Sequence, residues 1–555
     1  MAKTNLLKIY QNSFRDNWSL PALSQYGRGE VLTYGDFAKQ IAQTHILFRE
    51  CGVKKGDKVA VMGKNTVSWI VSYMATLTYG AVVVPVLAEF NPIDATHIIN
   101  HSGSKLLFVA ESIWEHMDME SMPQLLAAIS LDEKVVLAEH SSNKQRAEKA
   151  LKDIEGHFRR SYPNGFRPAD VVYPDIDKGA LAEINYTSGT TGFSKGVMLT
   201  LNNLAGNVQY GVDSHLHFPG SRCLAFLPLA HAYGAAFDML TPLAAGGHVA
   251  ALDKLPSPSL LVKALNQIKP NLIICVPLIL EKIYKKHLMP LLERKTVKYL
   301  MGTPLVERIV YARIRRKLIK TFGGEFSQVI VGGAPLNAEV EQFLHRIKFP
   351  FTVGYGMTEC APLISYTFWK NFIPGSSGQT LPGYMESKIL SSDPENIPGE
   401  ICVRGQNVMK GYYRNEEATK QVLEPDGWLH TGDMGTRSQD GTLFIKGRYK
   451  TMILSASGQN IYPEEIEAKL NNMPYVTESL VVERGKHLVA LVYPDYEEMD
   501  RDNITTEQLP EVMETVRLAL NKRVAPYEKI DRISLRASEF EKTPKRSIKR
   551  FLYQD

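Results

Sequence analysis

Largely apolar runs of a few residues alternate with segments of helical periodicity over most of the chain. The apolar runs, which predict buried strands, lie at residues 58–62, 81–86, 105–109, 271–276 and 328–331. Segments with helical spacing lie between them, for example at residues 258–268 and 338–346. Strands of this kind are typical of parallel sheets covered by helices on both faces. The pattern therefore predicts an α/β fold with mostly parallel sheets for residues 1 to about 440.

The longest apolar stretch, residues 69–90, is long enough to cross a membrane. However, Gly80 and Pro85 interrupt it, and the three valines at 82–84 are β-branched and favour a strand. We therefore predict a buried helix at about 67–79 that turns at Gly80 into a buried strand, and no transmembrane helix.

The pattern changes near residues 447–450. Beyond this point, helical spacing at 464–470 and about 507–524 accompanies strand-like runs at 479–482 and 488–492. A chain of 555 residues is also too long for one hydrophobic core. We expect two domains, a large one at 1–449 and a small α+β domain at 450–555.

Composition narrows the function classes. The net charge of +5 is small for 555 residues, so it agrees with an anionic small ligand and gives no support to nucleic-acid binding. The five cysteines are scattered without a CxxC pair, which predicts buried free thiols and a reducing cytoplasm. The first residues contain no apolar core of signal-peptide length.

The most informative segment is residues 186–197, which read YTSGTTGFSKGV and follow a strand-like alternation at 180–186. A strand that runs into a loop of glycines, hydroxyl side chains and a lysine is typical of proteins that wrap backbone N–H groups around phosphate. The segment is not a Walker A loop, since the spacing GxxxxGK[ST] is absent. The alternative, a surface linker, does not need the strand before it or the apolar residues 197–199 after it.

A second segment, residues 354–359, reads GYGMTE. Its glycines leave the backbone open to a flat ring beside Tyr355, and Glu359 offers the hard oxygen ligand that suits Mg²⁺. The alternative is a tight turn capped by Thr358.

Three more glycine turns carry candidate ligand contacts. Residues 329–335 form a strand that ends in a glycine turn, where ligands of open α/β folds bind. Asp433 follows Gly432, and paired carboxylate oxygens match the two hydroxyls of a ribose. Arg448 would supply fixed donors to ribose or phosphate. Each of these could instead be an ordinary turn.

Together these motifs resemble, in order, those of the adenylate-forming superfamily of acyl-CoA synthetases, luciferases and peptide-synthetase adenylation domains. The resemblance covers essentially the whole chain. It implies a large multi-subdomain body with mostly parallel sheets, a small mobile α+β C-terminal domain, and activation of a carboxylate by ATP and Mg²⁺ followed by transfer, usually to coenzyme A.

The resemblance also implies residue roles. Tyr355 would lie against adenine, Thr358 would meet phosphate during catalysis, and Asp433 would bind the ribose. ATP or AMP would be bound by Thr187, Ser188, Gly189, Thr190, Thr191, Gly192, Lys195, Gly333, Ala334, Pro335, Gly354, Tyr355, Gly356, Thr358, Asp433 and Arg448. Mg²⁺ would be held by Thr187 and Glu359, Lys450 would be the hinge between the domains, and Gly458 would border the pantetheine tunnel of coenzyme A.

The C-terminus departs from the family pattern. Members usually end in TPxxK, whose lysine bridges the carboxylate and the α-phosphate, but the ungapped position here is Ser547. On an extended segment Lys545 and Lys549 share the face of Ser547, so these two lysines are the candidate catalytic cations, Lys549 first. The alternative is a solvated basic tail.

Two segments, 226–234 and 275–284, resemble the long-chain fatty acyl-CoA synthetases. This likeness would make His231 a wall of the acyl pocket, and the alternative is a core histidine bonded to backbone. Residues 306–320 form an apolar helical stripe with Arg308, Arg315, Arg316 and Lys320 mostly off it. That face is either solvated or a contact for anionic lipid or coenzyme A phosphates.

Three hypotheses follow: a long-chain fatty acid–CoA ligase, an acyl-adenylate-forming ligase that loads a carrier protein, and a relative that binds nucleotide and acyl groups but is impaired in adenylation. We expect fatty acid, ATP and coenzyme A as small-molecule partners, no nucleic acid, and a cytoplasmic protein with possible peripheral contact to membrane lipid.

Overall fold

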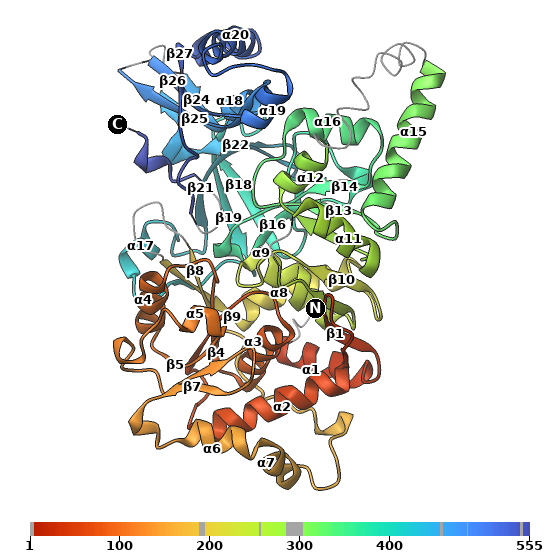
Figure 1. Ribbon diagram of the computed structural model, residues 1–555, viewed down its shortest axis with the longest axis vertical. Helices are drawn as coiled ribbons and strands as arrows, with labels where there is room; N and C mark the ends of the chain where they lie inside the picture. Colours follow the sequence, from red (N-terminus) through yellow and green to blue (C-terminus); the bar gives the residue numbers. More distant parts are fainter. Residues whose placement is uncertain are drawn as a thin grey trace.

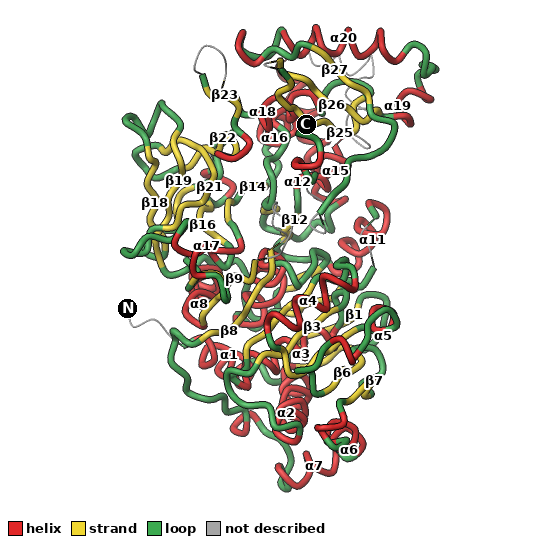
Figure 2. Tube along the Cα trace, turned by 90° about the vertical axis from the view of Figure 1, so that its left-hand side faces the viewer, coloured by secondary structure: helices red, strands yellow, loops and turns green. Residues whose placement is uncertain are grey.

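The computed structural model describes residues 5–187, 195–254, 257–284, 304–454, 459–485, 487–543 and 548–554. A large body built from several sheets carries a smaller C-terminal part at one end (blue in Figure 1). The view at right angles shows that the strands of the body form separate layers with helices between and around them (Figure 2). This is the expected α/β architecture.

The largest sheet has eight strands in the order β20-β9-β8-β4-β3-β5-β6-β7. Its middle strands, from β8 to β6, run parallel, while β7, β9 and β20 are antiparallel to their neighbours. The bounds are β3 Lys58–Met62, β4 Val82–Val86, β5 Ser104–Val109, β6 Ala127–Ser130, β7 Val136–Glu139, β8 Leu181–Thr187, β9 Lys195–Thr200 and β20 Gly411–Tyr412. The apolar runs predicted at 58–62, 81–86 and 105–109 are three central strands.

Helix α3 (Val67–Tyr79) packs against β3 and β4 and is almost wholly buried. It ends at Gly80, whose φ of +84° is a conformation that favours glycine, and β4 follows at once. The predicted buried helix and strand are therefore confirmed. No helix among the described residues is long and apolar enough to cross a membrane.

Two further sheets are mainly parallel. One has the order β10-β11-β1-β2 and the other the order β12-β13-β14. Their bounds are β1 Pro21–Gln25, β2 Val31–Thr33, β10 Arg222–Ala225, β11 His248–Ala251, β12 Ile273–Cys275, β13 Val329–Val331 and β14 Phe351–Val353. The longer helices of the body are α1 Leu6–Asp16, α2 Tyr34–Glu50, α4 Pro92–Ser102, α7 Ile154–Ser161, α8 Leu201–Asp213, α11 Pro258–Ile268, α15 Pro304–Thr321 and α16 Ala338–Arg346.

Between residues 355 and 448 the strands pair antiparallel, in the sheets β15-β16-β17 and β18-β19-β21-β22. These strands are β15 Tyr355–Gly356, β16 Leu363–Tyr366, β17 Gln379–Thr380, β18 Met385–Leu390, β19 Gly399–Gly405, β21 Leu429–Arg437 and β22 Leu443–Arg448. Short connections allow antiparallel pairing, whereas parallel neighbours need a crossover. This part of the body therefore adds antiparallel layers to the mostly parallel sheets.

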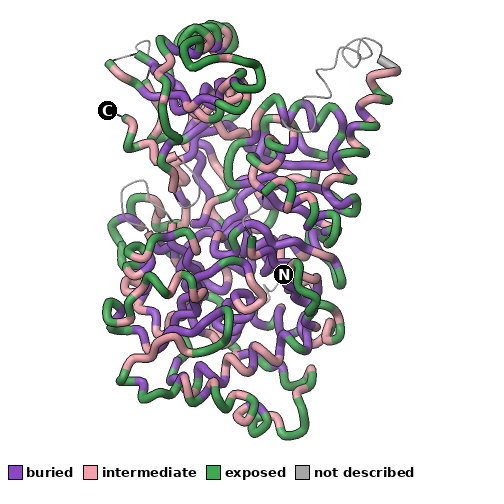
Figure 3. The backbone as a smooth tube through the Cα atoms, in the orientation of Figure 1, coloured by how far each residue is buried: buried purple, intermediate pink, exposed green. Residues whose placement is uncertain are grey.

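The C-terminal part has its own buried clusters, separate from the core of the body. It consists of β23 Ile453–Leu454, β24 Asn460–Ile461, α18 Pro463–Leu470, β25 Val476–Arg484, β26 His487–Pro494, α19 Tyr496–Arg501, α20 Leu509–Asn521 and β27 Arg532–Leu535. Buried residues (purple) run through the body, whereas α20 buries one side only (Figure 3). All five cysteines are buried and form no disulfide, as predicted.

Candidate active site

The predicted phosphate loop joins the two strands of a hairpin. Thr187, the last residue of β8, lies opposite Lys195, the first residue of β9, and its hydroxyl donates a hydrogen bond of 3.5 Å to the Lys195 carbonyl. The residues predicted to contact phosphate between them, Ser188, Gly189, Thr190, Thr191 and Gly192, lie outside the described residues. The hairpin fixes where this loop begins and ends.

Tyr412 connects the hairpin to Glu359. Strand β20 pairs with β9, so that Tyr412 lies opposite Val197. The Lys195 Nζ lies 4.9 Å from the centroid of the Tyr412 ring, and the Tyr412 hydroxyl donates a hydrogen bond of 2.9 Å to Glu359 Oε1. Burial and the Glu359 carboxylate raise the pKa of Tyr412, which keeps the phenol protonated as a donor. Lys195, Tyr412 and Glu359 are thus in contact at the end of the hairpin where the predicted phosphate loop begins and ends.

Thr358 and Glu359 belong to a short 3₁₀ turn, Thr358–Cys360, that follows β15. Thr358 is buried and Glu359 is half-buried. The turn needs a glycine before it, because a Cβ on Gly356 would lie 2.3 Å from the Pro362 carbonyl oxygen. Apart from Tyr412, no side chain among the described residues hydrogen-bonds the Glu359 carboxylate, so one oxygen is left for a ligand.

The predicted adenine and ribose residues are in contact. The Tyr355 hydroxyl lies 2.5 Å from Asp433 Oδ2, and Arg448, opposite Asp433 in the β21–β22 ladder, places its Nε 3.3 Å from Asp433 Oδ1. Burial raises the pKa of Asp433, while Arg448 and the Tyr355 hydroxyl oppose that rise and Glu359 adds to it. Tyr355 and Arg448 thus hold the two oxygens of the Asp433 carboxylate.

The glycine turn after β13 borders the same region. Gly333, Ala334 and Pro335 are exposed, and Gly333 has a φ of +86°. Gly332 lies against the ring of Tyr233, since a Cβ there would be 3.1 Å from Tyr233 Cζ. The structure therefore brings together the predicted turn, Gly354 to Thr358, and Asp433.

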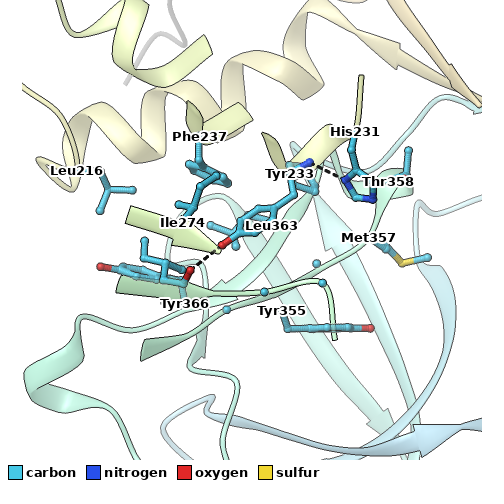
Figure 4. A pocket seen from close by; sticks show the side chains of 16 residues that line it. Leu216, His231, Tyr233, Phe237, Ile274, Tyr355, Met357, Thr358, Leu363 and Tyr366 are labelled. Carbon is cyan, nitrogen blue, oxygen red and sulfur yellow. Dashed lines mark hydrogen bonds between the residues drawn. The ribbon is translucent and has the colours of Figure 1, made fainter. Parts of the chain in front are cut away.

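An apolar pocket, partly open to solvent, begins among these residues. Gly333, Tyr355 and Thr358 line one part of it, and apolar side chains, including Leu216, Phe237, Ile274, Ile330 and Leu363, line the rest. Figure 4 shows Leu216 and Phe237 on the side away from Thr358. Among the described residues that line it there is no aspartate, glutamate, lysine or arginine. The pocket can therefore accept a hydrocarbon next to the predicted phosphate contacts.

His231 lines this pocket and also caps a short helix, α9 (Ala232–Gly234). Its Nδ1 accepts a hydrogen bond of 3.2 Å from the Tyr233 N–H, and the Tyr233 hydroxyl donates 3.0 Å to the Ile330 carbonyl (Figure 4). His231 is therefore bonded to backbone and also lines the pocket, and its contact with an acyl group stays a prediction.

The turn that carries the predicted hinge directly follows Arg448, whereas the predicted catalytic lysine has no contact with this cluster among the described residues. Lys450 is exposed in a 3₁₀ turn, Tyr449–Thr451, whose Thr451 hydroxyl donates 2.6 Å to Glu464 of α18. The Lys549 Nζ lies 3.5 Å from Glu541 Oε2, and no contact joins it to Thr358, Glu359 or Asp433 within the described residues. Gly458, Lys545 and Ser547 lie outside the described residues.

Sequence reasoning missed Tyr412 and Tyr233. Both are aromatic residues beside a glycine, and Tyr233 lies in the segment 226–234 that the resemblance already singled out. Their roles depend on long-range pairing of β20 with β9 and of α9 with β13, which periodicity does not predict.

The family model described as AMP-binding enzyme matches residues 11–413. The chain is 30% identical over 511 residues to the peroxisomal long chain acyl-CoA synthetase 7 of Arabidopsis thaliana, covering 85% of this chain and 70% of that protein. It is 29% identical over 505 residues to the long-chain-fatty-acid–CoA ligase of Escherichia coli O157:H7, covering 86% of this chain and 82% of that protein. The fold is similar to the O-succinylbenzoate coenzyme A synthetase (MenE) of Bacillus subtilis in complex with ATP and magnesium ion, with a TM-score of 0.74, 20% identity and 99% of each chain covered.

Proposed function

We propose that the acid activated by this chain is a long-chain fatty acid. The chain belongs to the AMP-binding enzyme family, and it is an adenylate-forming acyl-CoA ligase. The fatty carboxylate attacks the α-phosphate of ATP, pyrophosphate leaves, and an acyl-adenylate forms. The thiol of coenzyme A then attacks the acyl carbonyl and AMP leaves.

The apolar pocket is the observation that carries this proposal. Its lining is mostly apolar, and among the described residues it offers no charged partner for an amino group or a second carboxylate. A fatty acid would place its chain toward Leu216 and Phe237 and its carboxylate near Thr358. The two curated relatives above, both named as long-chain enzymes, support the same substrate class.

The nucleotide would lie across the residues that the fold brings together. Tyr355 and Gly333 to Pro335 would border the adenine, Asp433 and Arg448 would bind the ribose, and Lys195 and Thr358 would contact phosphates. Positioning and charge stabilisation by such groups are the main contributions of a protein to phosphoryl-type transfer.

A magnesium ion fits the Glu359 region by its chemistry. Glu359 is half-buried, one of its oxygens is fixed by Tyr412, and carboxylate and hydroxyl oxygens are ligands that Mg²⁺ accepts. Glu359 and Thr187 would hold the ion, which when bound neutralises phosphate charge. Tyr412 orients the carboxylate for this purpose.

We further propose that the domain boundary lies at residues 449 and 450, with Lys450 as the hinge. The separate C-terminal clusters and the contact of Thr451 with Glu464 at the junction support this boundary. A rotation there would carry Lys549 or Lys545 to the carboxylate and Gly458 to the pantetheine path of coenzyme A.

We also propose that the enzyme is cytoplasmic and contacts membrane lipid peripherally, and helix α15 supports the lipid contact. Arg308, Arg313, Arg316, Lys317 and Lys320 are exposed on it, and Ile309 is 51% exposed. The helix lies at the outer edge of the body (Figure 1). Anionic lipid attracts such a basic face, and sedimentation with phosphatidylglycerol vesicles but not phosphatidylcholine vesicles is the expected result.

Product analysis tests the proposed function. Incubation with palmitate, ATP and coenzyme A should give palmitoyl-CoA and AMP in equal amounts. Thioester formation only on an acyl carrier protein would favour the carrier-loading alternative, and the absence of any adenylate would favour the adenylation-impaired alternative.

A further inference from the structure

The Asp433 side chain is presented by a bulge between β19 and β21. Cys402 pairs with His430, and the next pair along the ladder is Glu400 with Met434. One residue therefore separates these pairs on β19, whereas three residues, 431–433, separate them on β21. Gly432 has a φ of +71°, which allows the extra residues to turn. Bulges of this kind redirect side chains beside functional sites.

The carboxylate of Glu400 holds this bulge from the side of β19. Its Oε1 accepts a hydrogen bond of 3.1 Å from the Gly432 N–H, one of the backbone groups that the bulge removes from the ladder. The Thr431 hydroxyl donates 2.7 Å to the Ile401 carbonyl and accepts 3.1 Å from the Asp433 N–H. Glu400 and Thr431 therefore anchor the backbone of the bulge that carries Asp433.

His430 fixes Glu400 through its ring. Its Nδ1 lies 2.8 Å from Glu400 Oε2, and its Nε2 lies 2.8 Å from Glu424 Oε1. Ionised carboxylates only accept hydrogen bonds, so both ring nitrogens must donate, and the ring is an imidazolium. The hydrogen bond that His430 donates to Glu400, together with the one to Glu424, raises the pKa of His430 above its ordinary value of 6.5, against the effect of burial.

Two other titratable groups face this triad. The Cys402 Sγ lies 3.6 Å from His430 Nδ1, and burial raises the pKa of this thiol to about 12, so it stays protonated. The Lys388 Nζ lies 4.0 Å from Glu424 Oε2. Glu400, Cys402 and His430 are close enough to share a metal ion, but the protons on the thiol and on Nδ1 favour the hydrogen-bonded ion triad.

We propose that His430, held as an imidazolium between Glu400 and Glu424, is a positioning residue for recognition of the nucleotide ribose. Its charge keeps Glu400 against Gly432, and the bulge then directs Asp433 toward the ribose hydroxyls. This inference rests on the proposed role of Asp433. It adds that nucleotide affinity depends on a proton that neither the nucleotide nor Asp433 carries.

The affinity for ATP should depend on pH through the charge of His430. Below the raised pKa of His430 the imidazolium donates to both carboxylates. Above that pKa one ring nitrogen becomes an acceptor that faces a carboxylate oxygen, so the ring loses its charge and one of its two donors, and its hold on Glu400 weakens. Affinity for ATP should therefore fall as the pH rises through a midpoint above 6.5.

The test measures the dissociation constants of ATP and 3′-deoxy-ATP by calorimetry across a pH series. His430→Gln should bind ATP at least fivefold more weakly than the wild type at pH 6.5, should lose the pH midpoint, and should bind 3′-deoxy-ATP almost as well as the wild type. Glu424→Gln keeps the imidazole and should move the midpoint to lower pH. The matched control is His487→Gln, since His487 also faces a carboxylate, Asp531, at 3.3 Å but lies in the C-terminal part.

Wild-type affinity and an unchanged midpoint in both His430→Gln and Glu424→Gln would overturn the inference. Asp433→Asn separates this outcome from failure of the proposed function. If Asp433→Asn binds ATP normally, the ribose assignment itself is wrong. If Asp433→Asn is impaired while the His430 and Glu424 variants are not, only the positioning role is wrong.

Discussion

The Tyr412 hydroxyl donates a hydrogen bond of 2.9 Å to Glu359, a residue 53 positions earlier in the chain. This contact joins the hairpin that carries the phosphate loop to the turn that carries the candidate metal ligand. Since the ring of Tyr412 also receives Lys195, the phenol fixes a cation and an anion at once. The hydrogen bond predicts that Tyr412 and Glu359 act in the same half-reaction, the formation of the acyl-adenylate.

Replacing Glu359 with Gln should lower adenylation by orders of magnitude. The change keeps the volume of the side chain but removes the anionic ligand for Mg²⁺. Palmitate-dependent exchange of pyrophosphate into ATP measures it. Glu386→Gln, at a position 62% exposed on β18, is the matched control and should exchange normally. Near-normal exchange in Glu359→Gln would rule out the metal assignment.

Replacing Tyr412 with Phe should weaken the orientation of Glu359. Loss of a hydrogen bond to a charged group corresponds to about 1.5–3 kcal/mol, or roughly one to two decades in the rate of adenylation. The apparent affinity for Mg²⁺ should fall in parallel. The neighbouring variant Tyr413→Phe loses only a 3.5 Å contact to the Ser102 carbonyl and should behave like the wild type. Equal rates for the two variants would contradict the role of Tyr412.

Replacing Leu216 with Trp should shorten the accepted acyl chain. Leu216 is 6% exposed and lines the apolar pocket, so the larger ring fills space that a long chain needs. The variant should lose activity with palmitate and keep it with hexanoate, at a stability cost of about 1–3 kcal/mol from overpacking. Product yields over acids of graded length measure this. A uniform loss at every length would show that the chain does not reach Leu216.

The stability of the body should depend on the protonation of Glu341 in α16. Burial raises the pKa of Glu341 from 4.5 to about 7, and its hydrogen bond from the Gly375 N–H only partly opposes this. A group with a raised folded pKa stabilises the fold at low pH, and the contribution is lost as the pH rises through about 7. The loss corresponds to about 3 kcal/mol. The difference in melting temperature between pH 5 and pH 8 should be smaller for Glu341→Gln than for the wild type. Glu339→Gln, an exposed position on the same helix, is the control and should show the wild-type difference.

Replacing Lys549 with Ala should suppress acyl-adenylate formation and spare thioester formation from preformed acyl-adenylate. A preorganised cation at the developing charge is worth roughly 3–4 kcal/mol, or two to three decades in rate. The double variant Lys545→Ala, Lys549→Ala covers the second candidate. Normal adenylation by the double variant would assign the charge to the body of the protein, with Lys195 next to be tested.

Periodicity predicted the local elements well, and the reason is burial. Strand β3 and helices α3 and α11 have the bounds that their apolar patterns predict, because β3 and α3 are buried and α11 buries one face against the body. The motifs likewise predicted that Tyr355 and Asp433 belong to one site, and the structure places them in contact. The pairing of β20 with β9, the bulge before Asp433 and the ion triad at His430 involve residues far apart in sequence, so no local pattern could predict them.

Pyrophosphate exchange with the wild-type protein tests the central proposal most directly. With ATP, Mg²⁺ and palmitate, and without coenzyme A, labelled pyrophosphate should enter ATP, and the rate should rise from hexanoate to palmitate. Added coenzyme A should convert the adenylate to palmitoyl-CoA. No exchange with any fatty acid, or exchange that is faster with benzoate than with palmitate, would contradict the account.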